Sequence, residues 1–282
     1  PHAYTEDQLV EQPAIGLFDK LGWQTVSAME EVFGDAEPSP QPSPKGRGGK
    51  AESAALGRET PGEVVLLPRL QTALERLNPR LPPEAVSSAI EEITRNRAAM
   101  LPAAANREVY QLLKEGIRVS VADTEPSPQP SPTGRGSGSS TPHHEHGRAE
   151  LPLRPNVAGG AATPPYQMGG QTTVRVQVID WEHPEENDFL LVSQMTIVGP
   201  LYTCRPDLIG FVNGLPLVVI ELKKPGVPAK QAFDENLTSY KHAQNGIPAL
   251  FWYNALLIAS NGTDSRVGTV TAGWERFVEW KR

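Results

Sequence analysis

Two apolar runs on either side of Asn213-Gly214 constrain the fold more than any other feature of this sequence. Asp207 to Val212 precedes the dipeptide and Leu215 to Lys223 follows it, and Asn-Gly between two such runs is typical of a tight β-hairpin. Leu217 to Ile220 is an unbroken aliphatic stretch. The second strand of the hairpin is therefore expected to be buried on both faces.

The rest of the chain indicates an α/β core that is interrupted by a mostly helical segment. Apolar residues at helical spacing predict a helix within Glu6–Glu31 and several helices over about Gly62–Val121. After that, the period changes from that of helices to that of strands. Outside the hairpin, strands are expected at 174–178, 189–198 and 249–260, with a helix at 229–243.

We therefore expect a single domain over residues 1–282, with a mixed central sheet flanked by helices. Its core is assigned to residues 5–35 and 172–282, its mostly helical insertion to 62–121, and two low-complexity inserts to 36–60 and 124–170.

The two inserts carry a repeat, which reads EPSPQPSPKGRG from Glu37 and EPSPQPSPTGRG from Glu125. Alternating Ser-Pro cannot form a regular ladder of backbone hydrogen bonds, so both inserts are expected to be disordered Ser/Pro/Gly-rich loops. A Pro-rich ligand for another protein is the alternative. His143-His144-Glu145-His146, in the second insert, could bind a transition metal incidentally.

Composition excludes several classes of protein. A membrane helix needs about 20 apolar residues in a row, and the sequence has no such run and no visible secretory leader. Cys204 is the only cysteine, which excludes an internal disulfide and a thiolate zinc cluster. We therefore expect a cytoplasmic protein with no membrane partner. The net charge is −7, but residues 201–282 carry 9 Lys and Arg against 7 Asp and Glu, so this part is the better candidate to face a polyanion.

The chemical signal is the set Asp207, Glu221 and Lys223 on the two strands of the hairpin. Glu221 and Lys223 share a face because side chains alternate along a strand. A two-residue loop at Asn213-Gly214 would pair Asp207 with Ile220 and leave Glu221 on the opposite face. A three-residue loop, with Gly214 left-handed, would pair Asp207 with Val219 and place all three side chains on one face. We expect the three-residue loop.

Such a face suits metal-assisted cleavage of a phosphodiester. Mg²⁺ prefers oxygen ligands and keeps several waters, so Asp207 and Glu221 suffice as side-chain ligands, and the carbonyl of Leu222 could add a third oxygen. Lys223 would orient a water and offset developing negative charge. The alternative is a solvated Glu221–Lys223 pair at the edge of the sheet.

Five stretches of this sequence resemble the N-terminal nuclease region of the type I restriction enzyme R subunit. They are RPDLIGFVNGLPLVVIELKKPG, LFWYNALLIASNGTDSRVGT, TEDQLVEQPAIGLFDKLGW, ANREVYQLLKEGI and VIDWEHPEENDFLLVSQ. The resemblance covers nearly all of the chain outside the two inserts. It implies a PD-(D/E)xK restriction-endonuclease-like core.

The resemblance assigns roles position by position. Asp207 and Glu221 match the metal-binding acids of the family, and Lys223 matches its catalytic lysine. The family has a Gln-x-x-x-Tyr motif on the following helix, which supports the site or contacts DNA. Tyr240 matches its tyrosine, whereas Asn236 stands at the glutamine and is one methylene shorter. A core aromatic is the alternative for Tyr240.

Related nucleases also place a glutamate of the first helix near the metal. Glu11 fits this position and Glu6 is the second choice; an ordinary exposed glutamate is the alternative for each.

The resemblance implies a Mg²⁺-dependent endodeoxyribonuclease of a type I restriction-modification system. Its partners would be double-stranded DNA and the methyltransferase and specificity subunits. ATP would serve only the motor domains of the full subunit, since this sequence has no G-x-x-x-x-G-K-[ST] motif. Two alternatives are a catalytically silent docking module and a stand-alone repair or junction-resolving nuclease.

Overall fold

The computed structural model describes residues 6–29, 31, 33, 56–122, 171–242 and 246–280. The chain divides into two compact units, Pro1–Ser120 with Thr173–Arg282, and Val121–Thr172. Almost all of the second unit lies outside the described residues, so the following paragraphs concern the first.

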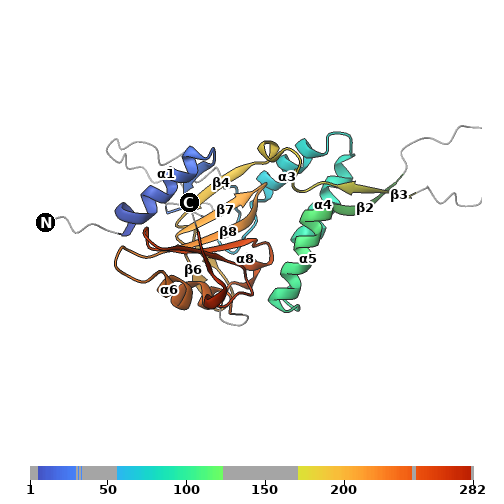
Figure 1. The fold of residues 1–282 in the computed structure, drawn as a ribbon. Helices are drawn as coiled ribbons and strands as arrows, with labels where there is room; N and C mark the ends of the chain where they lie inside the picture. Colours follow the sequence, from blue (N-terminus) through green and yellow to red (C-terminus); the bar gives the residue numbers. More distant parts are fainter. Residues whose placement is uncertain are drawn as a thin grey trace, which may run out of the picture. The chain divides into compact units, whose positions relative to one another are not determined.

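The centre of the first unit is a seven-stranded mixed sheet, which confirms the expected α/β class (Figure 1). Neighbouring strands pair parallel in β1–β4 and β8–β9, and antiparallel in the other pairs. The order across the sheet is β1 (Gln24–Ser27), β4 (Phe189–Ser193), β7 (Leu208–Val212), β8 (Leu215–Leu222), β9 (Leu256–Ser260), β10 (Ser265–Gly268) and β11 (Val278–Glu279).

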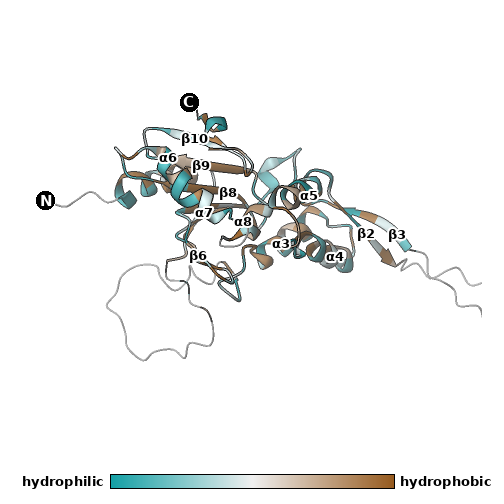
Figure 2. Cartoon of the chain, turned by 90° about the horizontal axis from the view of Figure 1, so that it is seen from below, coloured by the Kyte–Doolittle hydropathy of each residue, from teal (hydrophilic) through white to brown (hydrophobic). Residues whose placement is uncertain are grey.

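Helices lie on both faces of the sheet at β8 (Figure 1), a strand whose residues are mostly hydrophobic (Figure 2). A π-helical turn η1 (Asp7–Glu11) continues as α1 (Gln12–Lys20), and Val10 joins a buried cluster with Leu208, Ile220 and Leu222 on one face. A second helix runs through α6 (Ala229–Gln231), the π-helical η4 (Ala232–Leu237) and α7 (Thr238–Tyr240). Side chains alternate along a strand, so this second helix, which contacts Glu221 through Tyr240, lies on the face opposite Leu222.

The helical segment comprises α3 (Leu67–Leu77), α4 (Pro83–Thr94) and α5 (Pro102–Glu115), followed by β2 (Ile117–Ala122), which pairs with β3 (Gln171–Val176). At its start, the N–H of Leu66 donates to the carbonyl of Gly214 at the hairpin tip. The remaining elements are short: α8 (Pro248–Trp252), β5 (Ile197–Val198), β6 (Thr203–Cys204) and the 3₁₀ turns η3 (Pro184–Glu186) and η5 (Trp274–Arg276). No helix among the described residues is long and apolar enough to cross a membrane.

The hairpin forms where it was expected, but the expected three-residue loop is wrong. Val212 pairs with Leu215, and Asn213 and Gly214 both have positive φ, 51° and 77°, as a two-residue type I′ turn requires. The register then shifts by one residue between Gly210 and Phe211, where β8 carries the extra residue Leu217.

This β-bulge restores the arrangement for which the longer loop was invoked. Beyond the bulge, Leu208 pairs with Ile220. Extending this register by one residue sets Asp207 opposite Glu221, rather than diagonal to it. Paired residues of antiparallel strands share a face, so the two acids lie together although the turn has two residues.

Two other expected strands are shorter than predicted. The strand expected at 189–198 ends at Ser193, because Gln194 has a φ of 55° and leaves the extended conformation. The strand expected at 249–260 starts only at Leu256. It is preceded by α8, which begins at Pro248, and proline favours the first turn of a helix.

The two expected disordered loops and His143–His146 lie outside the described residues, apart from 56–60. In that short stretch Leu56 and Arg58 are buried, so residues 56–60 pack against the rest of the unit and do not belong to a solvated loop. The Arg58 guanidinium forms an ion pair with Glu31 and donates to three backbone carbonyls. Because Glu31 and Arg58 lie on either side of residues 34–55, this buried pair joins the two ends of that segment.

Candidate active site

The candidate site lies along one edge of the sheet. The pairing directions bring the carboxyl ends of β1, β4, β8 and β9 to the same edge as the amino end of β7. Asp207 directly precedes β7, and Glu221 and Lys223 stand at the end of β8. The hairpin therefore delivers all three predicted residues to one place.

Asp207 is tied to the neighbouring strand by its own carboxylate. Its Oδ2 accepts a hydrogen bond of 2.7 Å from the backbone N–H of Leu222. Its carbonyl accepts another, of 2.9 Å, from the N–H of Gln194. The carboxylate is thus held over the end of β8, next to Glu221.

Glu221 is the most deeply buried of the three residues, with 1% of its surface exposed. Its Oε1 has no hydrogen-bond partner, whereas the Tyr240 hydroxyl hydrogen-bonds the carboxylate. A solvated edge pair with Lys223 is therefore excluded. An unpartnered carboxylate oxygen in the interior is costly unless a cation or donor meets it.

The acids of this edge repel one another. Burial, and then the charge of Asp207, raise the pKa of Glu221 well above its usual value. Burial is also the main cause that raises the pKa of Asp207 and of Glu11, and the Asp207 charge adds to the effect on Glu11. A cluster of this kind favours a positive charge that would lower all three pKa values.

A chain of hydrogen bonds connects Lys223 back to Glu221. The Lys223 Nζ donates to Asn236 Oδ1 at 2.9 Å, and Asn236 Nδ2 donates to the Tyr240 hydroxyl at 3.1 Å. Tyr240 in turn contacts the Glu221 carboxylate. The asparagine at the glutamine position is therefore long enough to reach both of its neighbours, and Tyr240, although buried, is more than an apolar core residue.

Both helices that flank the site contain a π-helical turn at a site residue. Glu11 ends η1 and Asn236 lies within η4. Such turns are rare among protein helices in general, and those that occur are often found at functional sites. The wider turn shifts the direction of the side chains that follow it. Here they coincide with two residues that the sequence singled out.

Glu11 is buried at 7% exposure, so the interpretation as an ordinary exposed glutamate is wrong. Its Oε2 accepts a hydrogen bond of 2.9 Å from Gln194 Nε2, which also lies 3.4 Å from Asp207 Oδ1. Glu6, the second choice, accepts from the backbone N–H of Lys224 instead. The structure therefore brings Glu11 to the acids through Gln194.

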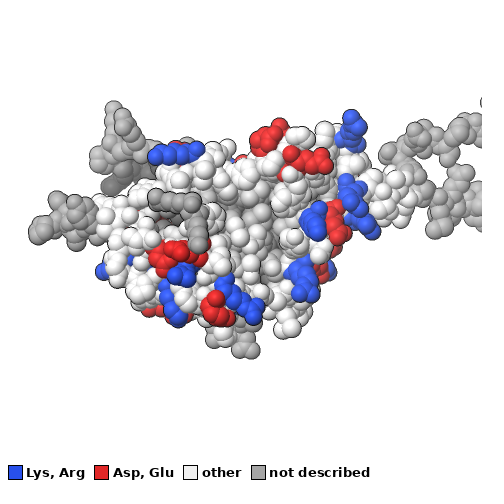
Figure 3. Space-filling model, in the orientation of Figure 1, with Lys and Arg blue, Asp and Glu red and all other residues white. Residues whose placement is uncertain are grey.

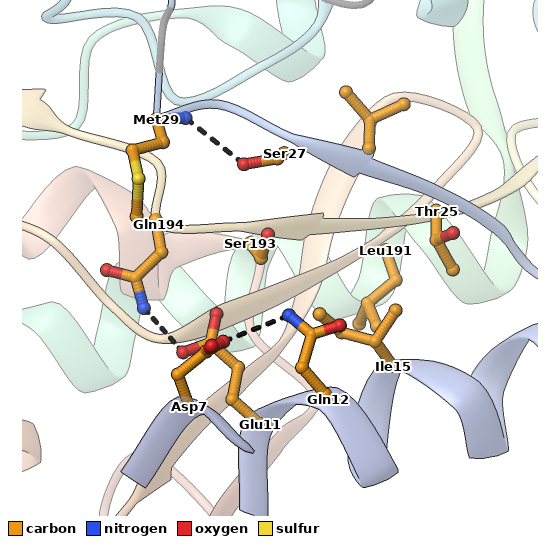
Figure 4. Close-up of a pocket in the computed structure, with 11 residues that line it drawn as sticks. Asp7, Glu11, Gln12, Ile15, Thr25, Ser27, Met29, Leu191, Ser193 and Gln194 are labelled. Carbon is orange, nitrogen blue, oxygen red and sulfur yellow. Dashed lines mark hydrogen bonds between the residues drawn. The ribbon is translucent and has the colours of Figure 1, made fainter. Parts of the chain in front are cut away.

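A cavity of about 400 Å³ lies beside these acids (Figure 4). Glu11 and Gln12 line it from the first helix, Ser27 from β1, and Ser193 and Gln194 from the end of β4. In Figure 4 the amide of Gln194 points toward the carboxylate of Glu11. Asp207 and Glu221 do not line it, so the cavity adjoins the acid cluster through Glu11 and Gln194, on the side of the first helix.

The donor set fits a hard divalent cation. The described residues contain no ready group of three His, Cys, Asp or Glu side chains placed around a metal position. Mg²⁺ requires less than that, since it keeps several waters and uses one or two carboxylates. The unpartnered, buried Oε1 of Glu221, next to the carboxylate of Asp207, fits a pair of acids that bind a cation. Asp207 and Glu221 are the residues that would hold it.

The sequence missed Gln194. It lies inside a stretch that reads as a continuous strand, and no spacing rule connects it with acids at 11 and 207. Only the fold shows that it stands between them.

A mixed sheet with an acid cluster and a tethered lysine at its edge defines the kind of site, and comparison with known proteins defines the family. The family described as "Type I restriction enzyme R protein N terminus" matches residues 3–130 and 157–276. The chain belongs to this family, as its motifs led us to expect.

Curated relatives agree. The chain is 32% identical over 222 residues to the type I restriction enzyme HindI endonuclease subunit of Haemophilus influenzae, which covers 77% of the chain and 16% of that protein. It is 34% identical over 120 residues to the putative MjaIXP endonuclease subunit of Methanocaldococcus jannaschii, covering 41% of the chain and 11% of that protein. With the EcoprrI endonuclease subunit of Escherichia coli it shares 37% identity over 32% of the chain and 29% of that protein. The chain thus spans less than a third of the length of these relatives.

Proposed function

We propose that this chain is the Mg²⁺-dependent endodeoxyribonuclease region of a type I restriction enzyme R subunit, with a PD-(D/E)xK core, and that it cleaves DNA phosphodiester bonds in the cytoplasm. The observation that carries the proposal is the convergence of Asp207, of Glu221 with its unpartnered Oε1, and of the Lys223 amine at one edge of the sheet.

Each residue has a distinct task in this proposal. Asp207 and Glu221 bind the cation, which, when bound, polarises the scissile phosphate and acidifies a water. The hairpin holds Asp207 in place through the Leu222 N–H, so its carboxylate is oriented before substrate arrives. The fixed geometry lowers the cost of assembling the site.

Lys223 supplies a positive charge to the site. Its amine is anchored by Asn236, and Glu235 lies 3.7 Å away, so its position is set by the helix that follows the hairpin. An ammonium there can orient the attacking water and stabilise the negative charge that develops on the phosphate. Asn236 and Tyr240 are positioning residues for Lys223 and Glu221.

The DNA is proposed to reach this site with the help of partner subunits. On the face drawn in Figure 3, basic and acidic side chains are interspersed over the described part of the chain. Strong sequence-independent binding to DNA depends on many unopposed Lys and Arg contacts with phosphates. The methyltransferase and specificity subunits, and the ATP-driven motor domains of a full subunit, would then supply recognition and delivery. The relatives from Haemophilus influenzae and Methanocaldococcus jannaschii, which are several times longer than this chain, leave room for such domains.

A nicking assay tests the proposal. Supercoiled plasmid is incubated with Mg²⁺, with and without added methyltransferase and motor proteins, and with the wild-type chain, Glu221→Ala, or the control Glu91→Ala, which changes an exposed glutamate of α4. With the added proteins present, we expect the wild type and Glu91→Ala to nick and Glu221→Ala to lose at least about 100-fold in rate, since it removes a metal ligand. Chelation of the metal should abolish all nicking.

The same assay distinguishes the alternatives. Equal nicking by the wild type and Glu221→Ala, or none by either at high concentration, would favour a docking module. Nicking that needs added methyltransferase and motor proteins would favour the restriction subunit over a stand-alone nuclease.

A further inference from the structure

We propose that Gln194 is a positioning residue that holds the carboxylates of Glu11 and Asp207 together, so that both face one divalent cation. The inference rests on the proposed function, because it concerns the same site. It adds a residue that neither the sequence motifs nor the matched family description assigns.

The side chain of Gln194 spans the two acids. Its Nε2 lies 2.9 Å from Glu11 Oε2 and 3.4 Å from Asp207 Oδ1. An amide nitrogen has two N–H groups, so it can donate to both carboxylates at once. Glu11 comes from the first helix and Asp207 from the start of β7, and the Gln194 side chain bridges them.

The backbone of Gln194 joins the same arrangement. Its N–H donates to the carbonyl of Asp207 at 2.9 Å, directly after the last β4–β7 pair, Ser193 with Leu208. Its φ of 55° is uncommon for a residue other than glycine, asparagine or aspartate. Strained residues of this kind persist only where the surroundings over-determine them, and they cluster at functional sites. The turn at Gln194 ends the strand and directs the amide to the acids.

The amide of Gln194 reduces the electrostatic repulsion between the carboxylates of Glu11 and Asp207. Without a cation, two neighbouring carboxylates repel each other, and burial removes the water that would screen them. A neutral amide that donates to both reduces this repulsion and orients one oxygen of each. The second lone pairs of these oxygens stay available, so a cation meets acids that are already in place.

Two substitutions separate the reach of the amide from the backbone conformation. Gln194→Asn keeps an amide and a residue type that tolerates positive φ, but it is one methylene too short to bridge. Gln194→Met keeps the length and removes both donors. Gln71→Asn is the matched control, because Gln71 makes the same kind of amide–carboxylate bond, 2.9 Å to Glu75, at an exposed position on α3.

The first measurement is Ca²⁺ binding by titration calorimetry, which needs no cleavage, and the second is the Mg²⁺ concentration for half-maximal nicking. Supporting partners of metal ligands change affinity or activity by roughly 10- to 100-fold. We expect both Gln194 variants to weaken Ca²⁺ binding and to raise the Mg²⁺ midpoint by about tenfold or more. Gln71→Asn should match the wild type in both.

A double-mutant comparison makes the test specific to the bridge. In a Glu11→Gln background, Gln194→Asn should weaken Ca²⁺ binding by a smaller factor than in the wild type, because one of the two bridged acids is already gone. A purely structural role for Gln194 would give the same factor in both backgrounds.

The possible outcomes keep the two proposals apart. If the wild type nicks with Mg²⁺ but Gln194→Asn and Gln194→Met change neither the Ca²⁺ affinity nor the Mg²⁺ concentration for half-maximal nicking, the positioning role is overturned and the nuclease stands. If the wild type binds Ca²⁺, never nicks, and the variants bind it more weakly, the positioning role stands and the nuclease falls. A wild type that binds no divalent cation overturns both.

Discussion

The amine of Lys223 lies 2.9 Å from Oδ1 of Asn236. Tyr240, four residues after Asn236 on the same helix, contacts Glu221 through its hydroxyl. This helix therefore contacts β8 and its end at both Glu221 and Lys223. Glu221 and Lys223 therefore do not depend on the strand alone for their orientation.

The first prediction concerns this connection. Asn236→Ala removes the acceptor of Lys223 and the donor to Tyr240, so we expect the nicking rate to fall by about 10- to 100-fold, as for other residues that orient a catalytic group. Glu235→Ala removes only an exposed partner 3.7 Å from the same amine, and exposed ion pairs contribute little. It should retain activity within about threefold of the wild type. Equal losses in the two variants would contradict the role of Asn236.

The second prediction concerns stability without metal. Glu221→Gln should stabilise the chain in the presence of a chelator at neutral pH by roughly 1–3 kcal/mol, because it replaces a buried carboxylate beside Asp207 by a neutral group. Urea denaturation measures the difference. In addition, Mg²⁺ should raise the melting temperature of the wild type more than that of the variant.

The pH dependence of this difference has a definite sign. The folded state raises the pKa of Glu221 above 4.5, so the folded chain holds a proton that the unfolded chain has already released. The contribution of Glu221 to stability is thus present below about pH 4.5 and is lost as pH rises through the raised pKa. The stability of Glu221→Gln relative to the wild type should grow as the pH rises from about 4.5 through the raised pKa of Glu221. Parallel pH profiles would contradict the assigned cause.

The sequence was informative where local rules decide the structure. Asn213-Gly214 and the apolar runs beside it were enough to place the hairpin, and the mixed α/β class followed from the change in period. The loop length was wrong because the bulge at Leu217 compensates for the shorter turn. A bulge depends on neighbouring strands and on Pro216, which cannot donate to the ladder, so turn rules do not reveal it.

The candidate site could be predicted only in part, because local sequence rules do not reveal long-range contacts. Residues close in sequence, Glu221 with Lys223 and Asn236 with Tyr240, could be paired from strand and helix periods. The burial of Glu11 and the role of Gln194 depend on contacts across more than 180 residues, and Gln194 interrupts a stretch whose pattern reads as one strand. Such long-range contacts need the fold.

The third prediction tests the hairpin tip with two glycines. Gly214 has a φ of 77°, and a Cβ there would lie 2.6 Å from the carbonyl oxygen of Leu66 and 2.7 Å from the backbone nitrogen of Leu70. We expect Gly214→Ala to destabilise the chain by at least about 2 kcal/mol, since strain and overlap add. Gly16, inside α1, has open space around it, so Gly16→Ala should stabilise by roughly 0.5–1 kcal/mol. Thermal melts of the two variants should therefore shift in opposite directions.

The fourth prediction concerns the ion pair between Glu31 and Arg58. Both side chains are almost fully buried, so Arg58→Ala leaves an uncompensated carboxylate and unpaired carbonyls, at a cost of about 3–5 kcal/mol. Lys230→Ala, which removes an exposed pair with Asp234, should cost less than about 0.5 kcal/mol.

A deletion completes this test. Replacing residues 36–55 by a short Gly-Ser linker should leave the melting temperature within a few degrees of the wild type as long as Arg58 is intact. A large loss of stability on deletion would show that these residues contribute to the fold beyond the ion pair that joins their ends.

The extra residue in β8 also restricts how this hairpin can change over time. Adding or removing a single residue between the turn and Glu221 would reverse the parity of the strand and turn the carboxylate into the apolar layer beneath the first helix. Only changes that come in pairs, or a second change that cancels the first, would preserve both the ladder and the two facing acids. Length variation in this hairpin is therefore expected in even steps, whereas single steps should coincide with loss of cleavage.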